Sequence, residues 1–338
     1  MRAVVTTAAG DVRVMKVQDR PDPELKPGQV LIRVKAAGLN FADILARQGL
    51  YPDGPPKPCV MGYEVSGVVE AVGRDADPGL AGQAVIAMTR FGGQAELLAV
   101  AAAQTFAKPD GLSFEEAAAI PVNYLTAWAL LVTMGGLKKD EAVLIHNAGG
   151  GVGLAALDIA RHIGAETFGT ASAGKHEFLR ARGLDHPIDY RNQDWLPALL
   201  SLTGGRGVEL IIDPLGGANW KKSFRGLRAT GRMGVFGISV ASASGITGKI
   251  RALKAILGMP RFNPIGLMNR NKAVFGLNLG HLWGEGEKVA SWTGEIMRGV
   301  AEGWIRPHVD RSFPFDQIGD AHTYIESRKN IGKVVLVP

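Results

Sequence analysis

The stretch Ala148-Gly149-Gly150-Gly151-Val152-Gly153 decides the fold that this sequence predicts. An apolar run at 142–146 precedes it and predicts a strand, and residues 152–163 follow with the apolar spacing of a helix. A tight turn, a close approach to phosphate and a close helix–strand contact each require little or no side chain. The helix start adds N–H groups and positive dipole. The context predicts a dinucleotide-binding loop, although the first position is Ala; a merely tight turn is the alternative.

Short apolar strands alternate with helical stretches from this loop to residue 278. Strands are expected at 166–170, 186–189, 208–213, 232–238 and 273–278, and helices at 177–182, 195–202 and 220–229. This alternation implies crossover connections and a parallel sheet covered by helices. We therefore predict an α/β protein with a doubly wound parallel sheet of the Rossmann type.

The first 122 residues have a different pattern, in which Gly and Pro interrupt short strand-like runs. The expected strands are at 3–7, 12–17, 29–36, 67–72, 84–88 and 94–100, with one helix near 41–47. A long helix at 286–303 and a last strand at 333–337 follow the Rossmann stretch. We expect these last elements to rejoin the β-rich domain. Residues 1–122 and 268–338 then form a catalytic domain around an inserted nucleotide-binding domain at 123–267, with the active site between the two.

Composition and charge exclude several classes of protein. The chain has 338 residues, of which 46% are apolar, enough for buried cores in two domains. Its formal charge of +6 is dispersed, and no basic run resembles a nucleic-acid-binding arm. The single cysteine, Cys59, excludes an intramolecular disulfide and fits a reducing compartment. The uncharged stretch at 117–137 contains Pro121, Asn123 and two glycines, which favours a buried helical passage over a membrane span. A soluble, cytoplasmic protein is expected.

The choice of cofactor depends on residues 169–175, at the end of the second expected strand, which read Gly-Thr-Ala-Ser-Ala-Gly-Lys. NAD enzymes usually place Asp or Glu there, on the ribose 2′-hydroxyl. No carboxylate is present in this stretch, and Ser172 and Lys175 could bind a 2′-phosphate. The alternative is a solvated lysine that starts a helix. The sequence favours NADPH over NADH.

Several stretches along the chain resemble the quinone oxidoreductase branch of the medium-chain dehydrogenase/reductases. They are 37–43, 47–51, the glycine loop, 213–217 and 332–338. Within that zeta-crystallin-like branch, 169–177, 186–190 and 269–280 look closest to the synaptic-vesicle membrane protein homologues. The resemblance implies a GroES-like catalytic domain split around a Rossmann domain, an oxidoreductase of the alcohol dehydrogenase superfamily, and a homodimer.

The resemblance also shows which metal ligands are missing. In the zinc alcohol dehydrogenases of this superfamily, a catalytic Cys occupies the position of Asn40 and a catalytic His occupies that of Tyr63, just before Glu64. A four-cysteine structural zinc site cannot form with one cysteine. None of the seven histidines has a metal-ligand spacing. We therefore expect no metal.

The missing metal ligands favour a conjugated acceptor. Hydride addition to a simple ketone develops alkoxide charge, which a Lewis-acid metal stabilises. Addition to a quinone or enone gives a phenolate or enolate, whose delocalised charge requires only hydrogen-bond donors. The expected substrate is a quinone or another α,β-unsaturated carbonyl. The alternatives are an enoyl-thioester reductase with the same hydride geometry and an NADPH- or lipid-binding protein with little turnover.

Asn40 and Tyr51 are the candidate catalytic donors, because the family pattern carries Asn at the first position and Tyr near the second. Alternatively, Asn40 caps the helix that follows it and Tyr51 only packs in a turn. The resemblance implies that Thr126 orients the nicotinamide. It also implies that Tyr190 and Arg328 contact the 2′-phosphate or the nicotinamide side. An ordinary helix residue and two surface residues are the alternatives.

The segment at 248–264 is both basic and amphipathic. Lys249, Arg251, Lys254 and Arg261 alternate there with Ile250, Leu253, Ile256 and Leu257. We interpret it as a lid or a dimer contact. The alternative is contact with a membrane surface, an anionic lipid or an acyl-CoA.

Overall fold

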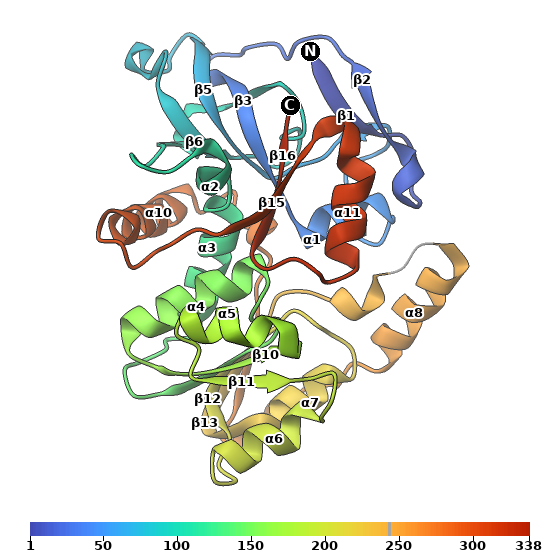
Figure 1. Cartoon of the computed structure of the whole chain (residues 1–338), viewed down its shortest axis with the longest axis vertical. Coiled ribbons are helices and arrows are strands. Elements are labelled where there is room, and N and C mark those ends of the chain that lie inside the picture. Colours follow the sequence, from blue (N-terminus) through green and yellow to red (C-terminus); the bar gives the residue numbers. More distant parts are fainter. Residues whose placement is uncertain (243–244) are drawn as a thin grey trace. The chain divides into compact units, whose positions relative to one another are not determined.

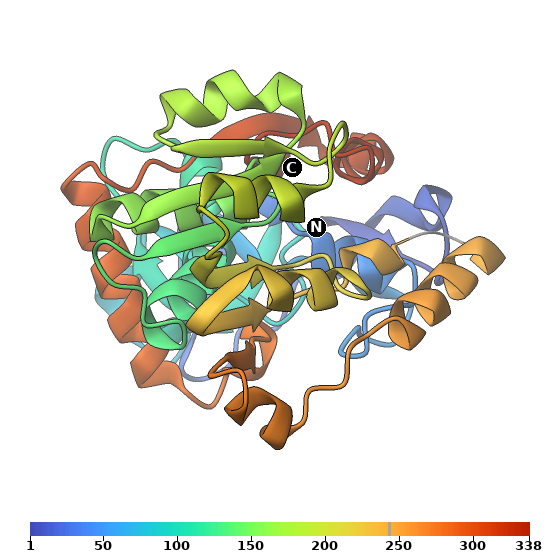
Figure 2. The same cartoon turned by 90° about the horizontal axis from the view of Figure 1, so that it is seen from below.

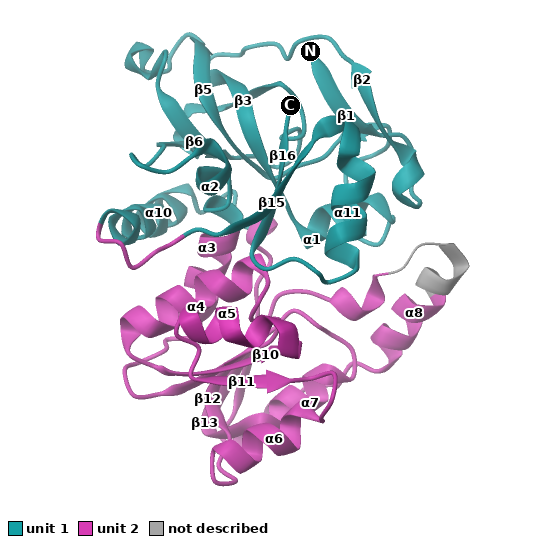
Figure 3. Cartoon of the chain, viewed as in Figure 1, with its two compact units in different colours: residues 1–122, 282–301, 307–338 teal, residues 123–281, 302–306 magenta. Residues whose placement is uncertain are grey.

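A computed structural model describes residues 1–242 and 245–338, which form two compact units of α/β structure (Figures 1 and 3). Unit 1 comprises Met1–Val122, Leu282–Ala301 and Pro307–Pro338, and unit 2 comprises Asn123–His281 and Glu302–Arg306. The first change of unit, after residue 122, falls where the sequence pattern changes.

The second change of unit differs from the boundary expected at 267/268. Residues 268–281 lie in unit 2, because strand β14 (Ala273–Gly276) pairs in parallel with β13 (Leu227–Val235). A short return to unit 2 at Glu302–Arg306 was also unexpected. It is held by Asp158, whose Oδ2 accepts the Arg306 N–H at 3.1 Å.

Unit 1 is built mainly on antiparallel strand pairing, and the one parallel pair of its main sheet joins the two C-terminal strands. Its main sheet runs in the order β15 (Val309–Pro314), β16 (Lys333–Val337), β3 (Gln29–Leu39), β5 (Glu64–Val72), β6 (Ala84–Met88) and β8 (Thr105–Ala107), and β7 (Leu97–Ala101) also pairs with β3. A smaller sheet contains β2 (Met15–Asp19), β1 (Arg2–Thr6) and β4 (Cys59–Val60). The last strand, β16, is antiparallel to β3, so the C-terminal elements do rejoin the β-rich unit.

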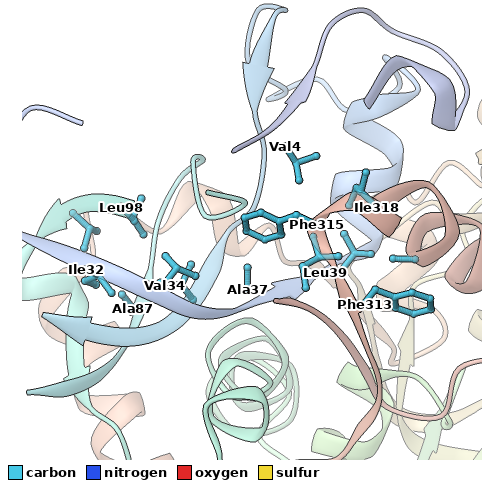
Figure 4. Packing of buried hydrophobic residues seen from close by; sticks show 14 of the residues in the cluster. Val4, Ile32, Val34, Ala37, Leu39, Ala87, Leu98, Phe313, Phe315 and Ile318 are labelled. Carbon is cyan, nitrogen blue, oxygen red and sulfur yellow. The ribbon is translucent and has the colours of Figure 1, made fainter. Parts of the chain in front are cut away.

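The core of unit 1 lies against β3, the longest strand of its sheet. Val30, Ile32 and Val34 are buried, whereas Arg33 and Lys35, on either side of Val34, are exposed, which is the alternation of a half-buried strand. Figure 4 shows this cluster continuing into Phe313, Phe315 and Ile318. Each large side chain buried there contributes roughly 1.5–3 kcal/mol. The helices of unit 1 are α1 (Phe41–Arg47), α2 (Phe114–Ala118), α10 (Gly286–Ala301) and α11 (Ile318–Glu326).

Unit 2 has the predicted Rossmann sheet. Its parallel strands run in the order β11 (His186–Asp189), β10 (Glu166–Ala171), β9 (Ala142–Ile145), β12 (Val208–Asp213), β13 and β14. The helices are α3 (Pro121–Trp128, shared with unit 1), α4 (Gly151–Ile163), α5 (His176–Ala181), α6 (Trp195–Leu202), α7 (Asn219–Gly226), α8 (Gly245–Leu257) and α9 (Pro264–Met268). Helices α4 and α5 lie on one face of the sheet and α6 and α7 on the other (Figure 1). The sheet order reverses between β9 and β12, the point at which such folds bind ligands.

The prediction of a helix at 220–229 was wrong at its end. Helix α7 stops at Gly226, and β13 begins at Leu227, five residues before the expected strand. Leu227 is 3% exposed and pairs with Val208, so burial in the sheet overrides the helical pattern of the sequence. The strand expected at 12–17 begins later, because Val12–Val14 form a 3-10 turn, and β2 then continues to Asp19.

Helix α8 carries the basic amphipathic segment and stands away from the strands of unit 2 (Figures 1 and 2). Its large apolar side chains from residue 250 onward are exposed, from 50% at Ile250 to 76% at Leu257, whereas Ala255 is buried. The side chain of Lys249 lies outside the described residues. Within 1–242 and 245–338, no helix has both the length and the apolar character to cross a membrane.

Candidate active site

The glycine loop leaves the carboxyl end of β9 and opens α4, next to the reversal of the sheet. Asn147 turns the chain in the left-handed region, with φ 55°, and Gly150 is the N-cap of α4. Ala148 is buried, and its N–H donates to the Thr170 carbonyl at 3.1 Å. The Ala148 methyl group fits at this first position because it packs against Gly169, which has no side chain. A Cβ on Gly169 would lie 2.8 Å from that methyl group.

The last glycine of the loop is required by close packing. A Cβ on Gly153 would lie 2.4 Å from the Asn147 carbonyl oxygen and 2.6 Å from that of Ala148. Neither backbone oxygen can move without disrupting the turn. The loop therefore has the close helix–strand contact and the open helix N-terminus that suit a pyrophosphate. These residues fit a dinucleotide.

Lys175 lies across the glycine loop. A Cβ on Gly149 would lie 2.9 Å from Lys175 Cδ and 3.7 Å from its Nζ. Lys175 ends the 3-10 turn Ala173–Lys175, which Ser172 precedes at the carboxyl end of β10. Both side chains are half-buried. The structure thus brings Lys175 to the loop, and Ser172, the other residue predicted to bind a 2′-phosphate, lies three positions before it.

Thr126, Tyr190 and Arg328 occupy three separate places. Thr126 is 7% exposed in α3, three residues after Asn123, whose amide would lie 2.6 Å from a Cβ on Gly151. Tyr190 is half-buried and directly follows β11. Arg328 follows α11 in unit 1, is exposed, and has a φ of 56°. Sequence reasoning missed Asn123, which contacts the loop directly.

A buried polar network lies at the carboxyl ends of the strands that flank the loop. His146 Nδ1 is 3.0 Å from Thr170 Oγ1, and its Nε2 is 3.1 Å from Ser223 Oγ. Ser223 donates to Asp213 Oδ2 at 2.7 Å. Because the Ser223 proton points to this carboxylate, His146 donates from Nε2 and accepts from Thr170 at Nδ1. Burial lowers the pKa of His146, which keeps the ring neutral.

This network supports the start of the glycine loop rather than forming a nucleophilic triad. Asp213 bonds Ser223 instead of His146, and all three side chains are at most 1% exposed, so no substrate reaches the serine. Thr170 Oγ1 also accepts the Asn147 N–H at 3.2 Å. The network therefore links β12 to the residue at which the loop turns.

In unit 1, Asn40 lies between β3 and α1, at the N-cap position of the helix. Its backbone N–H donates to Asp43 Oδ2 at 2.8 Å, and the Gly62 N–H donates to Asp43 Oδ1 at 3.1 Å. Burial raises the pKa of Asp43 to about 7, although these two hydrogen bonds and the charge of Lys333 oppose the shift. The carboxyl group whose pKa is raised in this way accepts a hydrogen bond from the backbone of Asn40.

The side chain of Asn40 is held by two residues that sequence reasoning did not assign. Its Nδ2 donates to Glu64 Oε1 at 2.9 Å, and Lys333 Nζ donates to Asn40 Oδ1 at 2.7 Å. Lys333 also forms a salt bridge with Glu64 Oε1. The second Glu64 oxygen accepts the Val122 N–H at 2.7 Å. Asn40 thus occupies the N-cap position of α1, as the alternative interpretation expected. Its side chain, however, bonds Glu64 and Lys333.

Tyr51 and Tyr63 are neighbours in unit 1. Their ring centroids are 6.4 Å apart in an edge-to-face arrangement, and the ring of Phe91 lies 5.5 Å beyond Tyr63. The hydroxyl of Tyr63 is buried and has no hydrogen-bond partner among the described residues. Burial, followed by the nearby Asp43, raises the pKa of Tyr63 well above that of an ordinary phenol. The aromatic rings of Tyr51 and Tyr63 form apolar surroundings that suit a planar conjugated molecule.

Metal-ligating side chains do not gather in the described part of the chain, where no group of three or more His, Cys, Asp or Glu could hold an ion. Cys59 is half-buried in β4, and burial raises the pKa of its thiol. Its Sγ lies 3.7 Å from Met61 Sδ. This environment suits packing better than nucleophilic chemistry.

Comparison with known proteins agrees with this architecture. Residues 26–126 match the family model of the alcohol dehydrogenase GroES-like domain, and residues 182–336 match that of the zinc-binding dehydrogenases. The rat synaptic vesicle membrane protein VAT-1 homolog is 41% identical over 100% of this chain and 84% of its own length. Human quinone oxidoreductase is 30% identical over 100% of this chain and 98% of its own.

Solved structures agree with the same architecture. Escherichia coli quinone oxidoreductase complexed with NADPH has a TM-score of 0.88 and 28% identity over 100% of both chains. A mycobacterial protein complexed with NADPH has a TM-score of 0.88 and 30% identity over 100% of both chains. The CurK enoyl reductase has a TM-score of 0.87 and 27% identity over 99% of both chains.

The fold and these relatives define a medium-chain dehydrogenase/reductase, an oxidoreductase family of GroES-like and Rossmann domains, and the chain belongs to it. Its relatives place it in the quinone oxidoreductase-like branch of that family, together with the VAT-1 homologs. The family resemblance predicted from the sequence is confirmed, and so is the Rossmann and GroES-like fold.

Proposed function

We propose that this chain is an NADPH-dependent reductase that transfers hydride to a quinone or another α,β-unsaturated carbonyl without zinc. The observation that carries this proposal is the side chain at Asn40. An amide donor, fixed by Glu64 and Lys333, stands where the zinc enzymes of the family have a cysteine ligand. A site of this kind stabilises a delocalised oxyanion by hydrogen bonding and supplies no Lewis acid.

The cofactor assignment is supported by the glycine loop and Lys175. The loop offers the N–H groups of three consecutive glycines, and the Lys175 ammonium beside Gly149 adds a positive charge that suits a 2′-phosphate. No carboxylate in residues 169–175 competes for a ribose hydroxyl. The neighbours solved with NADPH support the same choice.

In the proposed mechanism, bound NADPH supplies the hydride, and the residues of this chain bind and orient the acceptor. Asn40 Nδ2 donates to the carbonyl oxygen as negative charge develops there, and Tyr51 is the second candidate donor. The ring surface of Tyr51 and Tyr63 binds the planar acceptor. Thr126, Tyr190 and Arg328 remain proposed cofactor contacts. The reduced product takes its proton from solvent.

An acceptor panel tests the proposal. NADPH oxidation is followed with ortho-quinones, para-quinones, enals and crotonyl-CoA, and each measurement is repeated with NADH. We expect acceptor-dependent oxidation that is faster with NADPH, and no loss of activity after dialysis against a chelator. Tight NADPH binding without turnover of any acceptor would contradict the enzymatic assignment and favour a binding protein.

A second candidate, an enoyl-thioester reductase, is favoured by the similarity to the CurK enoyl reductase. Its hydride transfer to a conjugated thioester needs the same oxyanion donor, so the geometry of Asn40 does not separate the two. A kcat/KM for crotonyl-CoA far above that for the quinones would select it.

We also propose a homodimer in the cytoplasm. The family resemblance supports the dimer, and the single cysteine fits a reducing compartment. Sedimentation velocity of the purified chain tests the dimer, which a single monomeric species at micromolar concentration would contradict.

A further inference from the structure

The partners of Asn40 come from the ends of three adjacent strands of the unit 1 sheet. Asn40 directly follows β3, Glu64 begins β5 and Lys333 begins β16. Both β5 and β16 are antiparallel to β3, with Val65 opposite Ala37 and Val334 opposite Leu39. This register places the three side chains at one end of the sheet.

A glycine makes room for the carboxylate of this trio. A Cβ on Gly38 would lie 2.5 Å from Glu64 Oε1 and 2.7 Å from Glu64 Cδ. Any other residue at position 38 would displace Glu64 from Asn40. The end of β3 is therefore shaped around the Glu64 side chain.

The partners fix which way the Asn40 amide points. A lysine ammonium can only donate and an ionised carboxylate can only accept, so Oδ1 faces Lys333 and Nδ2 faces Glu64. Lys333 is 3% exposed and Glu64 is fully buried. An asparagine amide otherwise rotates over a broad, two-fold range, so both partners are needed to hold one orientation.

The second N–H of Asn40 makes only a long contact within the protein. The first N–H of Nδ2 bonds Glu64 at 2.9 Å, whereas the nearest other acceptor, the Gly38 carbonyl, is 3.4 Å away. A contact of this length is weak and exchanges readily for a shorter bond to an anionic oxygen.

We propose that Lys333 and Glu64 are positioning residues that present this second Asn40 N–H to the acceptor's carbonyl oxygen. The inference rests on the proposed function, in which Asn40 is the oxyanion donor. A buried ion pair is costly to desolvate and is weak evidence for a stabilising role. Lys333 also polarises the amide through Oδ1, which makes the N–H a stronger donor.

The test compares wild type with Lys333→Met and with the double variant Lys333→Met/Glu64→Gln. The double variant removes the buried carboxylate that the single change leaves unpaired, so it folds if the single variant does not. We expect kcat to fall roughly tenfold to a hundredfold in both variants. This decrease is somewhat smaller than the one caused by removing an oxyanion donor itself. Lys333→Arg keeps the charge and the donors and should recover part of kcat. NADPH affinity should change little, because the side chains of Lys333 and Glu64 bond only residues of unit 1 that are not proposed to bind the cofactor.

A matched control is Arg47→Met. Arg47 is 1% exposed in α1 and pairs with Glu326 at 2.7 Å, so this change also breaks a buried ion pair of unit 1. It leaves the partners of Asn40 in place. We expect it to lower the melting temperature, because removing one partner of a largely buried pair leaves the other charge uncompensated, while kcat stays within about twofold.

A second readout separates this inference from the proposed function. The probe is 4-nitrophenol bound to the protein–NADP⁺ complex, because its phenolate absorbs visibly and resembles the developing oxyanion. Wild type should favour the bound phenolate, and the Lys333 variants should lose that preference. If wild type neither ionises the probe nor reduces any acceptor, the proposed function fails. If wild type does both, and either Lys333→Met or the double variant retains wild-type kcat and ionisation, the positioning role is overturned.

Discussion

The glycine loop of unit 2 and the Asn40 end of the unit 1 sheet differ in how their functional groups are brought together. The loop and Lys175 lie within 28 positions, from 148 to 175, and the strand–loop–helix order alone indicated their contact. Asn40 bonds Glu64 and Lys333, which are 24 and 293 positions away. A site contained in one βαβ unit can be recognised from local sequence, whereas a site made where strands meet requires the sheet register.

The largest effect is expected from Gly153→Val, which disrupts the glycine loop of unit 2. The new side chain would meet two backbone oxygens within 2.6 Å, so the start of α4 must shift. We expect no measurable NADPH binding by cofactor fluorescence and a loss of at least about 1–3 kcal/mol of stability. The control is Gly294→Ala in α10, where a Cβ meets nothing within 4 Å; it should leave binding intact and add up to about 1 kcal/mol. Normal cofactor binding by Gly153→Val would refute the packing argument.

Lys175→Glu tests whether local sequence also specifies the cofactor. A charged hydrogen bond contributes about 1.5–3 kcal/mol, so the KM for NADPH should rise roughly tenfold to a hundredfold while that for NADH changes little. The matched control is Lys139→Glu, because Lys139 also packs on a glycine of unit 2, with its Cγ 3.2 Å from a Cβ on Gly164. Equal changes for both cofactors in the Lys175 variant would remove its phosphate-binding role.

The pH dependence of folding tests the Asn40 region. The pKa of Asp43 is raised to about 7 from an ordinary value of 3.8, so the folded protein keeps a proton that the unfolded chain releases. Its contribution to stability is complete below about pH 4 and is lost as pH rises toward 7. We expect the loss to be on the order of 2–4 kcal/mol by denaturant titration. Asp43→Asn, which cannot ionise, should flatten this decline; an equally steep profile in the variant would assign it to other groups.

The smallest effect is expected from Tyr63→Phe. This change removes a buried hydroxyl that has no partner among the described residues, and such a group costs roughly 1–3 kcal/mol when desolvated. We expect an increase of about 1 kcal/mol in the free energy of unfolding without ligand. Tyr324→Phe is the opposite case, because its hydroxyl donates to Asp310 at 2.7 Å, and it should destabilise. A destabilised Tyr63→Phe would mean that this hydroxyl is bonded after all.

The sequence predicted most of the fold because the apolar periodicity of each element agrees with its burial. Helix α6 and strands β6, β11, β12 and β16 begin and end at the expected residues. The end of α7 was missed because the burial of Leu227 depends on a strand 19 positions earlier in the chain. Helix α11 was missed because its packing into the core of unit 1, through Ile318 and Ala321, determines it more than its short sequence pattern does.

The candidate site was predicted in part. The glycine loop and Lys175 were found because each has a local chemical signature. Glu64 and Lys333 were not assigned, because a single acidic or basic residue at the start of a strand is common and only the register shows that these two meet. Asp43 was missed for a similar reason, since burial, which the sequence does not display, raises its pKa.

The antiparallel pairing of β16 with β3 also sets an order of assembly during translation. β3 emerges from the ribosome first, but its partner follows only after the whole of the Rossmann sheet has been synthesised. Until then, the end of β3 at Ala37–Leu39 lacks its β16 partner and Glu64 lacks its cation. The salt bridge that orients Asn40 is among the last contacts the chain can form, so a released chain truncated before residue 333 would contain the complete glycine loop but no oriented amide.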